Sequence, residues 1–321
     1  MNTQRRNFLK STALATGGVL FTDPLKKISG LTAQIPGLDH SVNTVTVFHT
    51  NDLHNQLHSF SSGNLSGHGG MQHISTIVRQ QEQPAVLVDA GDFLDASASY
   101  SAHRKMIDAM NHLGYHAAAV GNRELEKGQE YLSELAEHMD FRMVNCNYAF
   151  SHEGLQRQVA TYRIIRWGSY KIGITGVGTE LDPAFMRTEG IGFRHPYERA
   201  NAVAAQLKDQ CDLVICLSHL GLTKKSGRFN NTEFARQSEN IDIIVSGHQK
   251  ELHAAPKVIK NKLKEEVIVS HAGWGGLVTR QVSVTFRDGK KFLTDYRNFA
   301  PSQNTGEKFH HTYSRITSAT V

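Results

Sequence analysis

The feature of this sequence that most constrains its fold is a set of short apolar runs, each of which ends in a polar residue. The runs are nearly continuous in Val, Ile, Leu and Ala, which is typical of strands buried on both faces. Five of them cover residues 45–48, 85–88, 117–120, 213–217 and 241–245. The sequence therefore predicts buried strands in an α/β fold.

The residues that follow these runs are carboxylates, an amide and imidazoles. Ligands of open α/β sheets bind at the carboxyl ends of the strands, so we expect these side chains to converge on one cleft if the strands are neighbours. Oxygen and imidazole donors suit Mn, Fe, Zn or Mg rather than a metal that prefers thiolates. The candidate metal ligands are Asp52, His54, Asp92, Asn122, His219 and His248.

These ligands belong to five motifs in a fixed order. The motifs are Asp52-Leu53-His54, Gly91-Asp92-Phe93-Leu94-Asp95, Gly121-Asn122-Arg123-Glu124, His219 and Gly247-His248-Gln249-Lys250. Their order resembles that of the calcineurin-like metallophosphatases, most closely the catalytic domain of bacterial 5'-nucleotidases, from about residue 44 to about residue 286. The resemblance implies a four-layer α/β/β/α sandwich of two mixed sheets. It also implies a metal-dependent phosphoesterase that acts on phosphomonoesters such as nucleotides.

The resemblance assigns the ligands to two metal sites that share Asp92. The second site is complete, with Asp92, Asn122, His219 and His248. The first site keeps Asp52, His54 and Asp92, but Lys250 stands where the family has a histidine ligand. We therefore expect one or two divalent metal ions per chain.

Two interpretations of the first site remain open. A lysine ammonium does not bind a metal, and Lys250 beside Asp52 and Asp92 would be held in its charged form, where it replaces the charge of the first metal. Alternatively, His253 is brought into the same space by a turn and serves as the substitute ligand.

The catalytic candidates are Arg123 and Glu124, which follow the metal ligand Asn122. Arg123 stands where the family has its catalytic histidine. A guanidinium group binds phosphoryl oxygens but does not act as a general acid. We expect altered or reduced catalysis, with a catalytically inactive exported protein that binds anions or nucleotides as the alternative.

The N-terminus contains a second signal. Residues 3–10 combine the pair Arg5-Arg6 with Phe8-Leu9-Lys10, and a weakly apolar run too short for a membrane span follows. This pattern predicts twin-arginine export to the periplasm, with a signal and lead at residues 1–40 and the best cleavage candidate at Ala33. No cysteine near Ala33 offers a lipid anchor, so no stable membrane anchor is expected.

The rest of the chain is expected to form one metallophosphatase domain at residues 41–300, followed by a polar tail at residues 301–321. Helical patterns lie at residues 71–81, 102–113, 128–138 and 198–208, and residues 266–271, 277–286 and 292–296 are expected to be strands of a second sheet. The net charge of +5 belongs partly to the signal, so the mature chain does not indicate a nucleic-acid polymer as partner. The three cysteines are expected to be buried thiols.

Complete 5'-nucleotidases carry a separate C-terminal domain that stacks the nucleotide base, and we expect this chain to end before such a domain. The resemblance therefore does not imply nucleotide specificity. The expected partners are a small phosphorylated substrate and, as an open alternative, a separately encoded protein that supplies the missing domain.

Overall fold

The computed structural model of the protein describes residues 43–81, 83–224 and 227–299. The expected export signal at residues 1–40 and the expected tail at residues 301–321 lie outside the described residues. All elements described below lie between Thr44 and Phe299, within the limits expected for the metallophosphatase domain.

The first sheet of the described chain contains seven strands. Its order is β15 (Lys290–Phe299), β14 (Thr279–Arg287), β1 (Thr44–Thr50), β2 (Val86–Asp89), β3 (Ala117–Ala119), β4 (Arg142–Val144) and β6 (Val159–Ala160). Strands β1, β2, β3, β4 and β6 run parallel, whereas β14 is antiparallel to both β1 and β15. The sheet is therefore mixed, with a parallel centre and an antiparallel hairpin at one edge.

The second sheet repeats this plan with six strands in the described residues. Its order is β12 (Lys257–Lys260), β13 (Glu266–Ser270), β11 (Ile243–Ser246), β10 (Leu213–His219), β8 (Tyr170–Gly178) and β7 (Tyr162–Trp167). The middle four strands are parallel, and β12 and β7 are antiparallel edges. A small third sheet joins β5 (Tyr148–Phe150) to β9 (Ile191–Phe193).

The expected second sheet of residues 266–271, 277–286 and 292–296 is wrong as a grouping, although each segment is a strand. Strand β13 joins the sheet of β10 and β11, whereas β14 and β15 extend the sheet of β1. The reason is that strand patterns specify which face is buried but not which strand is the neighbour. The long β14–β15 hairpin pairs with β1 over six residues, from Thr44 opposite Thr285 onward.

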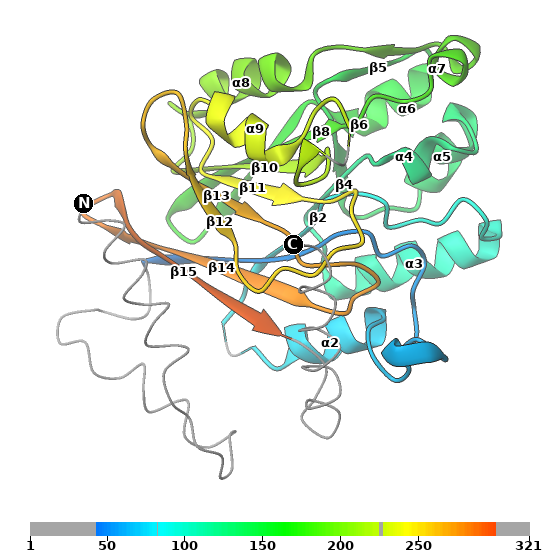
Figure 1. The fold of residues 1–321 in the computed structure, drawn as a ribbon, viewed down its shortest axis with the longest axis horizontal. Helices are drawn as coiled ribbons and strands as arrows, with labels where there is room; N and C mark the ends of the chain where they lie inside the picture. Colours follow the sequence, from blue (N-terminus) through cyan, green and yellow to red (C-terminus); the bar gives the residue numbers. More distant parts are fainter. Residues whose placement is uncertain (1–42, 82, 225–226, 300–321) are drawn as a thin grey trace.

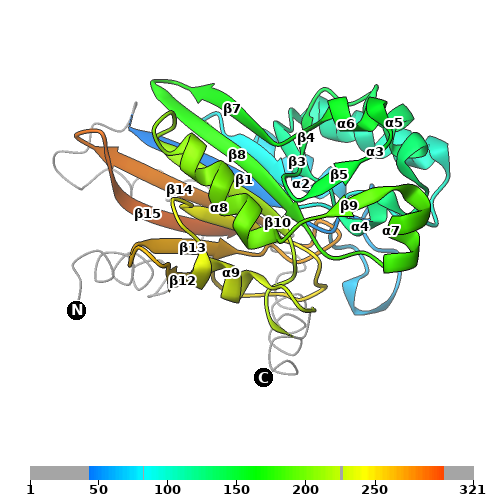
Figure 2. The same ribbon diagram turned by 90° about the horizontal axis from the view of Figure 1, so that it is seen from above.

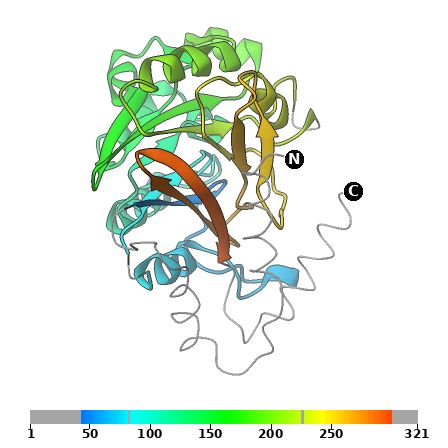
Figure 3. The same cartoon turned by 90° about the vertical axis from the view of Figure 1, so that its left-hand side faces the viewer.

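The two large sheets pack face to face, and helices cover their outer faces (Figure 1). The core between the sheets holds Val45, Val86 and Ala117 from one sheet against Ile174 and Ile215 from the other. In Figure 3 the sheets lie between a lower and an upper helical layer. This confirms the predicted four-layer α/β/β/α sandwich.

The lower layer contains α2 (Met71–Arg79) and α3 (Tyr100–Leu113), which bury their apolar faces against Phe48 and Leu87 of the first sheet. The upper layer contains α8 (Pro196–Leu207) and α9 (Asn231–Gln237), which pack on Val214 and Ile244 of the second sheet. The remaining helices lie near one end of the sandwich, away from the β14–β15 hairpin (Figure 2). They are α4 (Asn122–Leu125), α5 (Gln129–Ala136), α6 (Glu153–Gln158) and α7 (Pro183–Glu189); a short 3-10 turn covers Gly63–Leu65.

The carboxyl ends of β1 and β2 in the first sheet meet those of β10 and β11 in the second. A hydrogen bond of 2.8 Å from His219 at the end of β10 to the carbonyl of Ala90 after β2 joins them. The predicted ligands therefore lie where the two sheets meet rather than along the rim of a single sheet. Across residues 43–81, 83–224 and 227–299, no helix has both the length and the apolar character to cross a membrane.

Candidate active site

The loops that carry the ligands have unusual backbone geometry. Four of the six predicted ligands, Asp52, His54, Asp92 and His248, have positive φ angles of 53°, 45°, 57° and 77°. Positive φ is uncommon for residues with a Cβ, and such residues cluster at functional sites. The bends turn the chain at the end of each strand, so that each side chain faces the junction between the sheets.

Backbone hydrogen bonds hold the first two loops together. The N–H groups of Asp52 and His54 donate to the carbonyls of Gly91 and Asp92, each at 3.0 Å. Gly247 keeps the third loop close, because a Cβ there would lie 2.8 Å from both the Ala90 carbonyl oxygen and His219 Nδ1. The small residue thus permits a contact on which the site depends.

The first group of candidate ligands contains Asp52, His54 and Asp92, whose donor atoms lie within 4.8 Å of one another. The two carboxylates are only 2% and 3% exposed. His54 Nε2 lies 3.8 Å from Asp52 Oδ1. Asn51 donates to Asp52 Oδ2 at 2.7 Å and the backbone N–H of His248 donates to the same carboxylate at 3.0 Å, which fixes its orientation.

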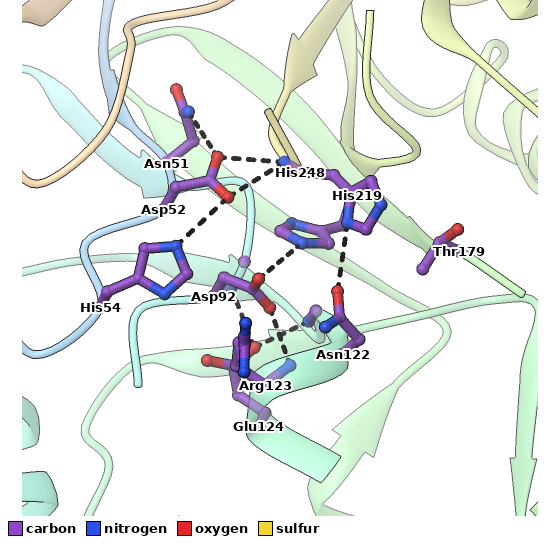
Figure 4. Close-up of polar contacts among 12 residues, drawn as sticks. Asn51, Asp52, His54, Asp92, Asn122, Arg123, Glu124, Thr179, His219 and His248 are labelled. Atoms are coloured by element: carbon purple, nitrogen blue, oxygen red, sulfur yellow. Dashed lines mark hydrogen bonds and ion pairs between the residues drawn. The ribbon is translucent and has the colours of Figure 1, made fainter. Parts of the chain in front are cut away.

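The second group contains Asp92, His219 and His248, within the same distance of one another. His219 Nε2 lies 3.1 Å from Asp92 Oδ2, and His248 Nδ1 lies 3.1 Å from Asn122 Oδ1. Figure 4 shows these side chains turned toward one another, with Asp92 between the two groups. The structure therefore brings together all six predicted ligands, with Asp92 shared.

The tautomer of His219 suits a metal. Its Nδ1 lies 2.8 Å from the Ala90 carbonyl oxygen, which only accepts, so Nδ1 carries a proton. The buried Nε2 atom faces Asp92 Oδ2 at 3.1 Å and has no other polar partner among the described residues. Histidine ligands of metals usually donate one ring N–H to a carbonyl or carboxylate and bind the metal through the other nitrogen. In His219 these two roles fall to Nδ1 and Nε2.

The charge balance also fits a divalent cation. Burial raises the pKa of Asp52 to about 8. Burial alone would lower the pKa of His219, but the negative charges of Asp92 and Asp52 raise it to about 10. For Asp92, burial raises the pKa and the charge of His219 lowers it, with a net decrease. Buried carboxylates that must recruit a histidine proton for balance match a site for a metal ion.

Glu124 is buried and faces the backbone rather than a substrate. Its Oε2 accepts hydrogen bonds from the N–H groups of Asp92 at 3.0 Å and Gly121 at 2.8 Å, and its Oε1 accepts one from Leu94 at 2.9 Å. It is 2% exposed. Its contacts make it a positioning residue that holds the Asp92 loop against the Asn122 loop, and the catalytic assignment made from the sequence stays a prediction.

Arg123 lies at the edge of the site. Its backbone N–H donates to Asp92 Oδ1 at 2.9 Å, and its side chain, 42% exposed, pairs with Glu126 at 3.0 Å. The guanidinium is close enough for its charge to help lower the pKa of His248, which burial and His219 lower to about 4. Arg123 therefore places a positive charge beside the ligand groups from an exposed, rotatable side chain.

Neither candidate for completing the first metal site belongs to a ligand group. Lys250 is exposed and has no ion pair with Asp52 or Asp92 within the described residues, although its charge contributes, after burial, to a lowered pKa of about 4 for His54. His253 pairs with Glu251 at 3.2 Å and packs edge-on against the ring of His271. His253 therefore contacts Glu251 and His271 instead of the ligand groups. Lys250 affects the first group through its charge, which adds to burial in lowering the pKa of His54.

A buried network under the site was not predicted from the sequence. Asp89 Oδ1 accepts from the Gly91 N–H at 2.8 Å, and its Oδ2 accepts from the Thr50 hydroxyl at 2.7 Å. Thr50 also contacts the Tyr115 hydroxyl at 2.8 Å. Asp89 lies two residues before Gly91 of the Gly-Asp motif, and its place at the end of an otherwise apolar strand is a signal that could have revealed it.

A two-sheet sandwich with paired ligand groups at the junction of its sheets defines a metallophosphoesterase, and the chain belongs to the calcineurin-like phosphoesterase family, whose model matches residues 45–251. This confirms the family predicted from the motif order. Snake venom 5'-nucleotidase of Gloydius brevicauda is 30% identical over 220 residues, which cover 64% of this chain and 36% of the relative. The 5'-nucleotidase of Vibrio vulnificus is 28% identical over 285 residues, which cover 78% of this chain and 50% of the relative.

Solved structures agree with these relatives. The 5'-nucleotidase precursor from Thermus thermophilus superposes with a TM-score of 0.67 and 26% identity, over 86% of this chain and 59% of that one. The calcineurin-like phosphoesterase YfkN from Bacillus subtilis, at 20% identity, shares the fold with a TM-score of 0.63, over 85% of this chain and 98% of that one. The chain spans about half the length, or less, of the curated 5'-nucleotidases named above.

Proposed function

We propose that the protein is a metal-dependent phosphoesterase that hydrolyses phosphomonoesters, nucleotides among them. The observation that carries this proposal is the pair of ligand groups that share the buried Asp92 and draw on loops from both sheets. A fold alone has no need for six such side chains at one point, four of them at positive φ angles close to buried strand ends.

The residues present have distinct tasks in this reaction. The candidate ligands Asp52, His54, Asp92, Asn122, His219 and His248 would hold a divalent metal, which would supply positive charge to the phosphoryl oxygens and lower the pKa of a water molecule. Asn51 and Glu124 hold the ligand loops in position. We propose that the guanidinium group of Arg123, which pairs with Glu126 in this structure, releases that carboxylate and binds two phosphoryl oxygens. Water forms the new bond to phosphorus as the bond to the leaving oxygen breaks.

We propose that the leaving oxygen obtains its proton from solvent, because the guanidinium group of Arg123 does not give up a proton at working pH. We therefore propose slower catalysis for alkoxide leaving groups than for phenolates, which depart without protonation. Loss of a general acid typically costs about 100- to 10,000-fold in rate. Lys250 keeps positive charge at the rim of the first site, and we propose that this site binds its metal more weakly than the second.

Export by the twin-arginine route to the periplasm is part of the proposal and rests on the Arg5-Arg6 pattern. A reporter protein fused to residues 1–40 should leave the cytoplasm. With the double change Arg5→Lys and Arg6→Lys in the fused segment, the reporter should remain in the cytoplasm. A separately encoded protein with the C-terminal domain of 5'-nucleotidases is proposed as a partner for nucleotide substrates. Copurification of such a protein with the tagged chain from its own cells would test this.

Metal-dependent hydrolysis tests the main proposal directly. The protein should be stripped with a chelator, reloaded separately with Mn, Fe, Zn or Mg, and assayed with 4-nitrophenyl phosphate and adenosine 5'-monophosphate. Activity should require a metal and fall by at least about 100-fold in His219→Ala. The control Arg157→Ala removes an exposed side chain that pairs with Glu153, away from the ligand groups, and should be unaffected. A metal-loaded protein that hydrolyses neither substrate would instead support an exported anion- or nucleotide-binding protein.

A further inference from the structure

A cavity of about 870 Å³ opens onto the site beside Asn122 and His248. It is bounded by the loop after β8, the start of α7 and the segment before α9, with Thr179 and Phe229 among its lining residues. Figure 4 shows Thr179 on the same side of the ligands as Asn122. The volume lies within the range of cavities that hold small molecules.

One wall of the cavity is an anchored aromatic ring. Phe229 is 8% exposed, and its ring packs edge-on against the rings of His195, at 4.9 Å between centroids, and Tyr197, at 5.4 Å. The Arg228 guanidinium lies 5.1 Å from the same ring. The ring is therefore fixed before any ligand arrives.

The remaining apolar lining comes from Leu181, Pro183 and Phe185. Asp182 holds this segment in place, because one of its carboxylate oxygens accepts from the N–H groups of Ala184 and Phe185, both at 2.9 Å. Pro183 at the first turn of α7 stiffens it further. Two rigid apolar surfaces in one cavity suit a flat ring system more than a flexible chain.

The charges at the cavity disfavour a second phosphate. Its described lining residues include the carboxylates of Glu126, Glu180 and Asp182 and one guanidinium group, that of Arg228. Arg228 lies 4.0 Å from Glu180, and Glu126 pairs with Arg123. The balance of these described groups is net negative, which disfavours a leaving group that carries its own phosphate.

We propose that this cavity holds the leaving group of the substrate and selects a neutral, flat ring system over a leaving group that carries phosphate. The inference rests on the proposed phosphoesterase function, whose scissile group would lie at the adjoining Asn122 and His248. Aryl alcohols and nucleosides share this chemistry. The selection would come from residues of this chain, including Phe185, Phe229 and Glu180.

Matched substrate pairs test the ring contact. Phenyl and 1-naphthyl phosphate differ in ring size, and ribose 5-phosphate and adenosine 5'-monophosphate differ by the base. In metal-loaded Phe185→Ala, kcat/KM for the larger member relative to the smaller should fall by about 3- to 20-fold. The control Ile164→Ala, which removes an exposed side chain of β7 that does not line the cavity, should leave both ratios unchanged. A fall in one pair alone shows whether aryl or nucleoside groups enter the cavity, whereas unchanged ratios in both pairs overturn the inference.

A charge change tests the second part. In Glu180→Gln, kcat/KM for adenosine 5'-diphosphate relative to the monophosphate should rise by about 2- to 5-fold, and no rise would refute the selection against phosphate. Calorimetric binding of 1-naphthol and adenosine keeps the two proposals separate. The wild-type protein could lack hydrolytic activity and still bind 1-naphthol or adenosine more tightly than Phe185→Ala does. That result would contradict the proposed phosphoesterase function and support the ring-binding role of the cavity. Equal binding by the two proteins, or none, would contradict the cavity alone.

Discussion

Replacing Glu124 with glutamine separates a positioning role from a catalytic one. The carboxylate accepts three backbone hydrogen bonds, from Asp92, Gly121 and Leu94. An amide offers one oxygen, which can keep the bonds to Asp92 and Gly121, while its NH2 group faces the Leu94 N–H without an acceptor. Leaving one buried donor unpaired costs about 1–3 kcal/mol. Burial raises the pKa of Glu124 to about 8, so loss of its negative charge adds little at pH 7 in the metal-free protein. We expect Glu124→Gln to lower the free energy of unfolding by about 2 kcal/mol.

Urea unfolding of the metal-free and metal-loaded variant measures this loss. A typical domain has about 5–15 kcal/mol of stability, so the variant should remain folded. Because Asp92 belongs to both ligand groups, displacement of its loop should also weaken metal binding and reduce kcat. Glu126→Gln is the matched control. Its carboxylate is exposed and pairs with Arg123 at the surface, so a change of at most about 1 kcal/mol is expected.

The reasoning would be refuted by the opposite pattern. If Glu124→Gln keeps its stability and metal affinity within about 0.5 kcal/mol of the parent but loses kcat by about 1,000-fold, Glu124 takes part in the chemical step. The catalytic assignment made from the sequence would then be correct, and the three backbone contacts would not describe its main task.

Three further predictions concern Lys250, Arg123 and His271. After dialysis, elemental analysis should find close to one tightly held metal ion per chain in the parent protein. The variant Lys250→His should hold close to two. Two metal ions in the parent protein would contradict the role given to Lys250. Arg123→His should raise hydrolysis of adenosine 5'-monophosphate by about 10- to 1,000-fold and leave 4-nitrophenyl phosphate nearly unchanged, and an equal rise for both would exclude leaving-group protonation as the cause. Burial, helped by the charge of His253, lowers the pKa of His271 to about 3, so its contribution to stability is complete above about pH 6.5 and is lost as the pH falls toward 3. His271→Gln should therefore flatten the fall in unfolding free energy between about pH 6.5 and pH 4, and an unchanged slope would count against this.

The sequence predicted the strands whose burial shows as a continuous apolar run. The runs at residues 45–48, 213–217 and 241–245 correspond to β1, β10 and β11. The antiparallel pair β7 and β8 was not predicted, because Tyr162–Trp167 and Tyr170–Gly178 mix polar residues and glycine with the apolar ones. Gly178 of β8 leaves room for the Tyr148 ring, a tertiary reason for glycine that local propensity does not reveal.

The strand patterns did not predict which of the two sheets each strand joins. Val45 pairs with Val284 across most of the chain, and nothing in either segment identifies its partner. A buried strand pattern reports the burial of its faces, whereas its neighbours are decided by the packing of the whole domain.

For the site, the order of motifs indicated which residues would meet. The order of motifs did not indicate the direction of the side chains of Lys250 and Glu124. Lys250 occupies a ligand position in the motif but lies exposed at the rim, and Glu124 follows Arg123 in the chain yet is turned into the backbone of two loops. Side-chain direction at the end of a strand depends on local φ angles, such as those of Asp52 and His248, which the sequence does not give.

The location of the ligands at the junction of two sheets has a consequence for how the protein matures. One ligand group joins Asp92 of the first sheet to His219 and His248 of the second, so neither sheet completes it alone. The other group belongs to the first sheet, yet its Asp52 carboxylate is held by the backbone N–H of His248, 196 residues further along the chain. We therefore expect tight metal binding only after both sheets have formed and docked. A metal that binds only the completed site would mark the folded chain, and it would stabilise the packing of the two sheets against unfolding.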